Sequence, residues 1–424
     1  MFPDHVSRKH KNMITVKAQK NLQAAKTYFD EHLERDDYYK EGGQELGKWR
    51  GKLALELGLN GEVSKEAFHR LAMGVHPQTG NKLTQRLRKD RVAYFDFVCS
   101  APKSVSIVGL VAGDTRVVEA HQRAAESAFK FLERSAAVRD RQGAKVLSME
   151  RHYTGTIVAA VFDHEASRSL DCQLHRHMCV FNVTRDGSKL KALDARRMYE
   201  HTKAATAIYR SELAGHLARI GYRVKVTEKD LIIEGVSPAL IEKFSTRSRE
   251  LKRLFAENER DHQRELNNNE RSALVHRNRE KKKPLAKSVF HQQLKDRLLP
   301  DETKMMVDLV ASAKGKQVVK SIQREIPKRW RHPQKKVPAL ELFQRLILAG
   351  SGRVKPDTVE KALLGLDENR NPYRSYDVGR GNFRLAENLL LGGRGNVLSL
   401  ILRCITHTSY ELERSLDVRM ERYR

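Results

Sequence analysis

Hydrophobic and polar residues follow two different periods along this chain of 424 residues. Alternation with a period of two, or a short unbroken apolar run, is typical of strands, whereas apolar residues every three to four positions are typical of helices. The first pattern predicts strands over 13–16, 92–99, 104–111, 145–162, 174–183, 222–226 and 231–234. The second predicts helices over 22–34, 64–74, 115–137, 194–219, 238–260 and 270–280. This mixture predicts an α+β fold in which helices flank a central antiparallel β-sheet.

Three histidines lie in or beside two of the predicted strands. His175 and His177 are two residues apart, so on a strand they point to the same face. His164 follows the strand-like run that ends at Phe162. If the two runs pair, His164 can complete a three-nitrogen site with open positions, which is what a catalytic metal needs. Ordinary surface or core histidines are the alternative, and the pattern of three favours the metal site.

Tyrosines near the N-terminus are candidate nucleophiles. Tyr28 lies in a polar stretch, and Asp36-Asp37-Tyr38-Tyr39 follows it. A tyrosine can attack a phosphodiester and hold the cut end as a phosphotyrosyl ester. The alternative is that these tyrosines pack as amphipathic helix residues. Asp96 interrupts an apolar run, and an inward carboxylate there is expected to pair with an imidazole N–H.

The charge of the chain favours a polyanionic partner. Lys and Arg number 80 against 53 Asp and Glu, a formal net charge of +27. Each phosphate that such a surface neutralises releases condensed counterions, so nucleic acid is the expected ligand. The apolar run at 397–402 stops at Arg403, far short of a membrane span, so no membrane insertion is expected. Four cysteines without Cys-x-x-Cys spacing predict a reduced, cytoplasmic protein.

Several motifs resemble those of a known family. The run from Phe95 to Ser106 resembles the FDLTFSAPKSVS signature of conjugative relaxases of the MobF class. The segment from His164 to His177 resembles their metal motif, with the same spacing between the histidines. The stretches at 36–39, 49–63 and 244–248 match further motifs in the same order. Within the metal motif, Cys172 stands where the family usually has Pro and Arg176 where Thr is usual.

The resemblance implies a function and assigns residues to it. Members of this class are HUH-type endonucleases, which nick one DNA strand at a transfer origin through a 5′-phosphotyrosyl intermediate. By the resemblance, the ligands of one divalent ion (Mg, Mn or Zn, left open) are His164, His175 and His177, the acid that orients a ligand is Asp96, and the nucleophiles are Tyr28 and Tyr38. The DNA contacts expected are Lys103, Arg168, Arg247, Lys282 and Lys283.

The chain is expected to have three parts and several partners. Residues 1–12 are expected to be a flexible leader, 13–285 the relaxase domain, and 286–424 a basic accessory region, mostly helical. The expected substrate is single-stranded DNA with an adjacent duplex or hairpin. No P-loop motif is present, so a separate helicase and accessory transfer proteins are expected as partners. A rolling-circle replication initiator, a non-catalytic DNA-binding regulator and a hydrolase of small phosphates are the alternatives.

Overall fold

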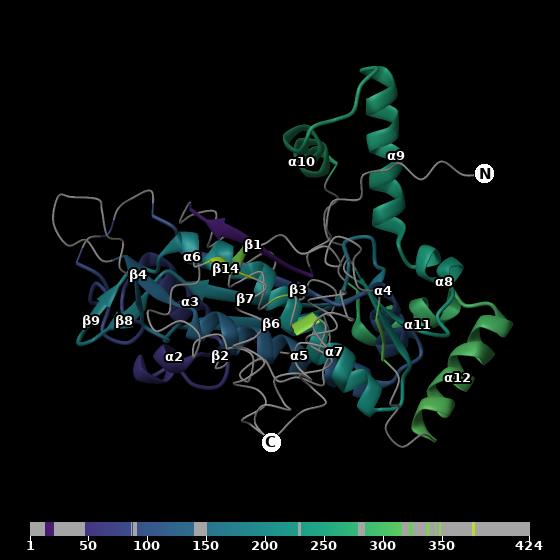
Figure 1. Ribbon diagram of the computed structural model, residues 1–424, viewed down its shortest axis with the longest axis horizontal. Helices are drawn as coiled ribbons and strands as arrows, with labels where there is room; N and C mark the ends of the chain where they lie inside the picture. The colour runs from purple at the N-terminus through teal and green to yellow at the C-terminus, as the bar shows by residue number, and fades with distance from the viewer. Residues whose placement is uncertain are drawn as a thin grey trace, which may run out of the picture.

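A five-stranded antiparallel sheet with the order β1–β3–β7–β6–β2 organises the fold (Figure 1). The computed structural model describes residues 13–20, 47–85, 87, 91–139, 151–227, 230–278, 285–315, 322–324, 336–338, 344, 347–348 and 375–377. The strands of this sheet are β1 (Ile14–Gln19), β2 (Lys48–Arg50), β3 (Tyr94–Ser100), β6 (Ala159–Ala166) and β7 (Cys172–Phe181). The longest ladders join β7 to β3 and β6, so β7 is the centre of the sheet. The predicted α+β class and the antiparallel sheet are therefore confirmed.

Two long helices, α5 (Thr115–Arg134) and α7 (Thr202–Arg219), cover one face of the sheet. Alanines such as Ala124, Ala128 and Ala214 are fully buried there, which lets the helix backbones lie close to the strands. Short α6 (Ala195–Glu200) precedes α7, and His201 separates the two helices. This face holds the larger hydrophobic core, which accounts for most of the buried apolar surface.

The opposite face carries a smaller core rich in aromatic rings. Helices α2 (Lys52–Glu56) and α3 (Lys65–Met73) cover it, and Phe68 of α3 is completely buried. The ring of Phe68 makes edge-to-face contacts with Tyr94, Phe162 and Phe181, with ring centroids 5.4, 6.4 and 5.0 Å away. These three residues come from β3, β6 and β7, so one side chain holds the centre of the sheet together at this end.

The C-terminal part of the described chain forms a separate layer and a projecting arm. Its elements are β10 (Val224–Val226), β11 (Leu231–Ile233), α8 (Pro238–Lys243), α9 (Thr246–Asp261), α10 (Asn268–Arg277), α11 (Lys287–Asp296), α12 (Pro300–Lys314) and β12 (Ile322–Arg324). The arm, defined here as α9 and α10, rises away from the sheet (Figure 1). Phe290 of α11 and Met306 of α12 belong to the larger core, so packing continues past residue 285. None of the described helices is both long and apolar enough to cross a membrane.

The smaller elements complete the described chain. They are the pairs β4 (Ala137–Arg139) with β5 (Arg151–Tyr153), β8 (Thr184–Asp186) with β9 (Lys189–Lys191), and β13 (Lys336–Pro338) with β14 (Ser375–Asp377). The expected leader at 1–12 and the helix expected at 22–34 lie outside the described residues. The division of the chain at 285 stays a prediction.

The strand predicted over 104–111 is wrong, because this segment is helical. It forms α4 (Lys103–Ser106) and the π-helix η1 (Ile107–Val111). The helix is buried on all sides, so it has no polar face and its sequence shows no helical period. Its serines bond outward instead: Ser104 Oγ accepts from Ile233 N, and Ser106 Oγ from Leu174 N, both at 3.1 Å. These bonds tie the helix to β11 and β7.

Three other predicted elements are interrupted. The helix expected over 194–219 is divided at His201, and the helix expected over 238–260 is divided at Phe244 and Ser245 into α8 and α9. Within 145–162, the described strands are β5 and β6, separated by residues 154–158. Hydrophobic period identifies such segments but does not locate breaks that side-chain packing imposes.

Gly221, which follows α7, lies against α12, so a substitution at this position measures how much the packing of α12 contributes to stability. Gly221 has a φ of +99°, and a Cβ at this position would collide with the carbonyl oxygen of Ala313 in α12. Gly221→Ala should therefore cost roughly 3 kcal/mol of unfolding free energy or more, from backbone strain and the clash together. The matched control is Gly187→Ala, whose φ is +57° with open space around it and whose cost should stay near 1 kcal/mol. Equal losses in urea unfolding would show that α12 is not held against α7.

Candidate active site

The three histidines and Asp96 occupy one face of the central strands, next to the aromatic core. Along β7, Phe181, Cys179, His177 and His175 alternate with residues of the larger core, and so share the face of the smaller one. His164 lies directly opposite His175 in the β6–β7 ladder. Side chains on this face thus change from aromatic rings to imidazoles along the strands. The pairing of the two histidine runs is confirmed.

The spacing of the rings matches a shared metal ion. Ring centroids are 5.1 Å apart for His164 and His175, 5.3 Å for His164 and His177, and 5.4 Å for His175 and His177. An ion about 2.1 Å from each nitrogen lies about 3.2 Å from each ring centre, so tetrahedral angles separate the centres by about 5.2 Å. Among the described residues, no three His, Cys, Asp or Glu side chains hold a metal as they stand. The donor set therefore fits in kind and spacing, and the rings must turn on fixed strands to converge.

Hydrogen bonds at Nδ1 determine the tautomer and the orientation of two of the rings. His177 Nδ1 lies 2.9 and 3.0 Å from the two carboxylate oxygens of Asp96, a residue that is only 2% exposed. His175 Nδ1 lies 2.8 Å from the backbone carbonyl of Gln173. Both partners accept hydrogen bonds, so Nδ1 carries the proton in each ring and Nε2 keeps the lone pair. The predicted pairing of Asp96 with an imidazole is confirmed, and it holds the ring of His177 through Nδ1 so that Nε2 is left for a ligand.

An ion pair supports the histidine strands from behind. Arg176 points to the opposite face of β7, where its Nε and Nη2 each donate to the carboxylate of Asp163 at 2.7 Å. Its Nη1 donates to the carbonyl of Gln122 in α5 at 3.2 Å. Burial alone would raise the pKa of Asp163, but the hydrogen bonds and charge of Arg176 outweigh it and keep the pKa below its usual value. Sequence reasoning missed this pair; the signal was an Arg between two same-facing histidines.

Next to this pair, a buried neutral histidine makes stability depend on pH. His121 Nδ1 lies 2.8 Å from Tyr209 Oη, and burial, followed by the charge of Arg176, lowers the His121 pKa to about 4. In the unfolded chain His121 has its ordinary pKa of about 6.5. Between pH 4 and pH 6.5 it therefore takes up a proton in the unfolded chain but stays neutral in the folded chain. Stability is therefore complete above pH 6.5 and falls as the pH drops towards 4. At pH 5 the loss should be about 2 kcal/mol.

A His121→Gln variant isolates this contribution, because glutamine stays neutral and can still bond to Tyr209. Urea unfolding at pH 7.5 and pH 5.0 should show wild-type protein losing about 2 kcal/mol more than the variant. His216, whose pKa burial also lowers to about 4, contributes equally to both proteins and cancels. An identical pH response of the two proteins would contradict the assignment.

The other described site residues that were predicted lie on three different elements. Lys103, at the start of α4, donates to the carbonyl of Cys172 at the start of β7, 2.8 Å away. Arg168 lies in the turn between β6 and β7, and Arg247 lies in the first turn of α9, donating to the carbonyl of Asn278 at 3.0 Å. Their role in DNA binding stays a prediction. Outside the described residues lie Tyr28, Tyr38, Lys282 and Lys283.

The fold and the strand-borne histidines are those of a conjugative relaxase domain of the MobF class. The family model described as TrwC relaxase matches residues 22–299, and the chain belongs to this family.

Curated relatives and solved structures agree with this family. The multifunctional conjugation protein TraI of Escherichia coli is 32% identical over 260 residues, which cover 58% of this chain and 14% of that protein. TraI of Escherichia coli strain K12 is 31% identical over the same length. The chain thus spans about 14% of the length of these relatives.

Structures of the conjugative relaxase TrwC in complex with OriT DNA superpose well. The metal-bound structure gives a TM-score of 0.58 at 27% identity and covers 67% of this chain and 96% of that one. The copper-bound structure gives 0.57 at 28% identity with the same coverage. A complex of TrwC with a 27-mer containing the recognition hairpin and the cleavage site gives 0.56 at 26% identity.

Proposed function

We propose that this chain nicks one strand of DNA at a transfer origin and rejoins it by strand transfer. The observation that carries the proposal is the set of three imidazoles on one sheet face, with Asp96 orienting one of them. A catalytic metal site of this kind keeps positions open for a substrate phosphate. The TrwC complexes with OriT DNA and the net charge of +27 support DNA as the substrate.

His164, His175 and His177 would hold one divalent ion. Imidazole ligands suit Zn, Cu, Fe and Ni by softness, while availability can make Mg or Mn the working ion, and the copper-bound and metal-bound TrwC structures support a metal here. Such an ion would polarise the scissile phosphate and offset the charge that develops on it. Asp96 keeps His177 in the tautomer that binds metal, and Arg176 with Asp163 holds the strand from the other side. The strands would therefore fix the backbone positions of the three ligands, and the rings would turn to converge on the ion.

Tyr28 and Tyr38 would supply the nucleophiles. In the first transfer the hydroxyl oxygen of Tyr28 bonds to phosphorus, the bond from phosphorus to the 3′ oxygen breaks, and a 3′ hydroxyl leaves with a proton. Tyr38 would serve a second transfer. The segment that contains both begins after β1 and ends at Gly47, where a Cβ would collide with the ring of Phe162 on the histidine face. This attachment supports bringing a tyrosine to the histidines.

The substrate we propose is single-stranded DNA with an adjacent hairpin, and a TrwC complex with DNA that comprises the recognition hairpin and the cleavage site supports it. A helicase and accessory transfer proteins complete the set of partners, and a cytoplasmic location follows from the DNA substrate. Aromatic stacking of splayed bases and phosphate contacts from Lys and Arg would provide specificity.

Covalent trapping is the test. The protein is incubated with end-labelled single-stranded DNA from the transfer origin of the element that encodes it, with Mn²⁺ and with a chelator in parallel. A metal-dependent band of the mass of protein plus DNA is expected on a denaturing gel. Cleavage without any adduct would mean a hydrolytic nuclease instead. Binding without cleavage in any divalent metal would identify a DNA-binding regulator.

A further inference from the structure

The turn that joins the two histidine strands is fixed to helices that follow it by 75 to 126 positions in the chain. This turn, Ser167–Asp171, lies between His164 and His175. Ser167 N donates to the carbonyl of Asp171 at 2.9 Å, and Asp171 N donates back to Ser167 Oγ at 3.1 Å. Leu170 has a φ of 53°, which is unusual for a residue with a branched side chain. The turn is therefore a closed unit, and Asp171 cannot shift without moving the strands.

The carboxylate of Asp171 caps the first helix of the arm from outside that helix. It is 1% exposed, and its oxygens accept from Thr246 N at 2.7 Å and from Thr246 Oγ1 at 3.0 Å. Ser245, the residue in the N-cap position of α9, makes no capping bond with its own side chain. A carboxylate at a helix N-terminus also meets the positive end of the helix dipole. A residue 75 positions earlier in the chain thus performs the capping.

A second connection joins the same turn to α11. Arg297, directly after α11, donates to Asp171 at 3.0 Å and stacks over Phe244 with its guanidinium 4.4 Å from the ring centroid. Glu165, next to His164, forms an ion pair with Lys287 at 3.0 Å and a hydrogen bond with His291 at 2.8 Å, both on α11. Asp171 therefore lies where the histidine strands, α9 and α11 meet.

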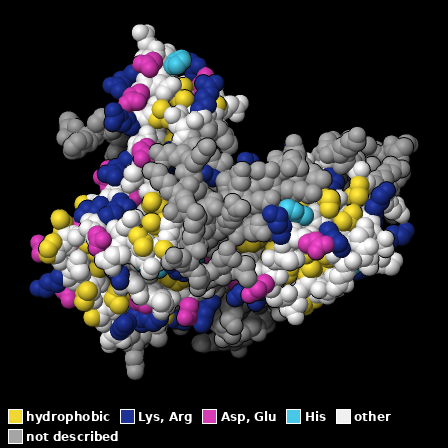
Figure 2. Space-filling view, turned by 180° about the vertical axis from the view of Figure 1, so that it is seen from behind, with side chains coloured by type: hydrophobic (Ala, Val, Ile, Leu, Met, Phe, Trp, Pro, Cys, Tyr) yellow, Lys and Arg dark blue, Asp and Glu magenta, His cyan; other side chains and the backbone are white. Residues whose placement is uncertain are grey.

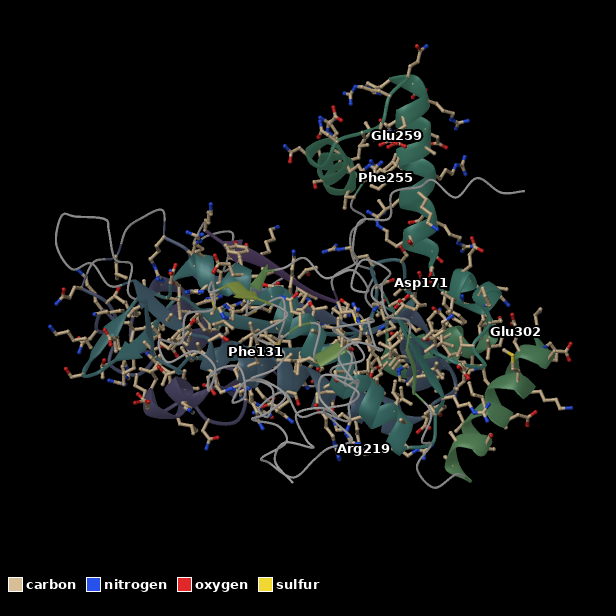
Figure 3. All side chains as sticks on the ribbon, in the orientation of Figure 1. Phe131, Asp171, Arg219, Phe255, Glu259 and Glu302 are labelled. Carbon is tan, nitrogen blue, oxygen red and sulfur yellow. The ribbon has the colours of Figure 1, made fainter. Side chains whose placement is uncertain are left out.

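The arm depends on these contacts for its orientation. None of the side chains of α9 is buried, so among the described residues no hydrophobic core fixes the angle at which the helix leaves the body. Figure 3 places Asp171 at the foot of α9, with Phe255 and Glu259 farther along the arm. Lys and Arg side chains are interspersed with Asp and Glu on the arm surface that Figure 2 shows. The contacts at the N-terminal end of α9, here called the foot of the arm, therefore determine the orientation of the arm.

We propose that Asp171 is a positioning residue that fixes the arm relative to the histidines. The inference rests on the proposed nicking function, because its consequence is the placement of DNA that reaches both the arm and the site. When the hydrogen bonds from Thr246 to Asp171 are lost, the histidines stay in place and the arm changes its angle to the sheet. DNA then still binds, but the scissile phosphate is presented less often in the reactive position. A displacement of about 1 Å can lower a rate on the order of a hundredfold.

Three variants separate this role from general structural support. Asp171→Asn removes the charge that Arg297 and α9 share. Thr246→Val removes one hydrogen bond at nearly constant shape, and Thr246→Ser restores the hydroxyl. Nicking is measured as a single-turnover rate at saturating transfer-origin DNA, and metal affinity by calorimetric titration with Mn²⁺ in the absence of DNA. We expect Asp171→Asn and Thr246→Val to slow nicking about tenfold or more, with metal affinity within about twofold of wild type and Thr246→Ser near wild type.

Arm position is measured directly between nitroxide labels at Leu55→Cys, on α2, and Arg253→Cys, on α9, in a Cys404→Ser background. These two side chains are 70% and 84% exposed, and Cys99, Cys172 and Cys179 are buried. The distance distribution should broaden in Asp171→Asn and Thr246→Val. An unchanged distribution, or a loss of Mn²⁺ affinity parallel to the loss of rate, overturns the proposal. If wild-type protein nicks no DNA, the proposed function fails, while the label distances still test the coupling.

Discussion

Replacing Tyr28 with Phe should abolish the covalent protein–DNA adduct while leaving the protein folded. The substitution keeps the ring and removes only the oxygen that attacks phosphorus, so metal and DNA binding should match wild type. Adduct formation on a single-stranded oligonucleotide should fall to background, because the remaining phenylalanine has no group that can form the ester. Denaturing gels with labelled DNA measure the adduct, and filter binding measures affinity for the same oligonucleotide.

Tyr38→Phe is the matched control for this experiment. It should still cut the oligonucleotide and fail only where two successive transfers are required. Peptide mapping of the trapped wild-type adduct then identifies the attacking residue independently of any variant. DNA attached to Tyr39 or to a serine would overturn the assignment, and DNA attached to Tyr38 alone would reverse the order of the two tyrosines.

Replacing His177 with Ala should remove metal binding and nicking together. His177 lies between the other two imidazoles and its carboxylate partner, so its loss leaves two ligands and an Asp96 carboxylate without this imidazole partner. We expect the nicking rate to fall about a thousandfold, which corresponds to several kcal/mol of transition-state stabilisation. DNA affinity should change little because it depends on basic side chains. Wild-type rates in this variant would show that the three histidines do not hold the catalytic metal.

Two further variants accompany His177→Ala: one tests the role of Asp96, and the other is a control histidine outside the site. Asp96→Asn keeps a side chain of the same size but weakens the acceptor at Nδ1 of His177, and should lower metal affinity about 10- to 100-fold without removing it. His76→Ala removes a histidine whose ring accepts two backbone hydrogen bonds in a turn, and should leave nicking unchanged. In all these proteins metal binding should weaken as the solution becomes more acidic, because protons compete for the imidazole nitrogens.

The geometry around the histidines was predictable because it depends on short-range rules. A strand places His175 and His177 on one face by its period alone, and a short turn pairs this strand with the run that His164 follows. The pairing of Asp96 with a histidine could be predicted because a carboxylate inside an apolar run needs a hydrogen-bond partner, and the histidines are on a strand distant in sequence. The chemical roles of these residues stay predictions until the variants are measured.

What could not be predicted depends on contacts between segments far apart in the sequence. The helix at 103–111 is buried all round, so its apolar pattern is the same as that of a buried strand. Asp171 lies inside a recognised motif, yet its partners Thr246 and Arg297 are 75 and 126 positions away. Only the folded chain shows that a residue of the metal motif also caps the arm.

The interleaving of two sets of side chains along β7 limits how this gene can vary. Even-numbered residues such as Leu174 and Met178 face the larger core, and the odd-numbered His175 and His177 face the site. An in-frame codon deletion or insertion within the strand would send histidines into the core and leucine to the active face at once. Loss of function by such a change is also loss of the fold. Changes within β7 that inactivate the domain but leave it folded are therefore expected to be base substitutions rather than changes of length.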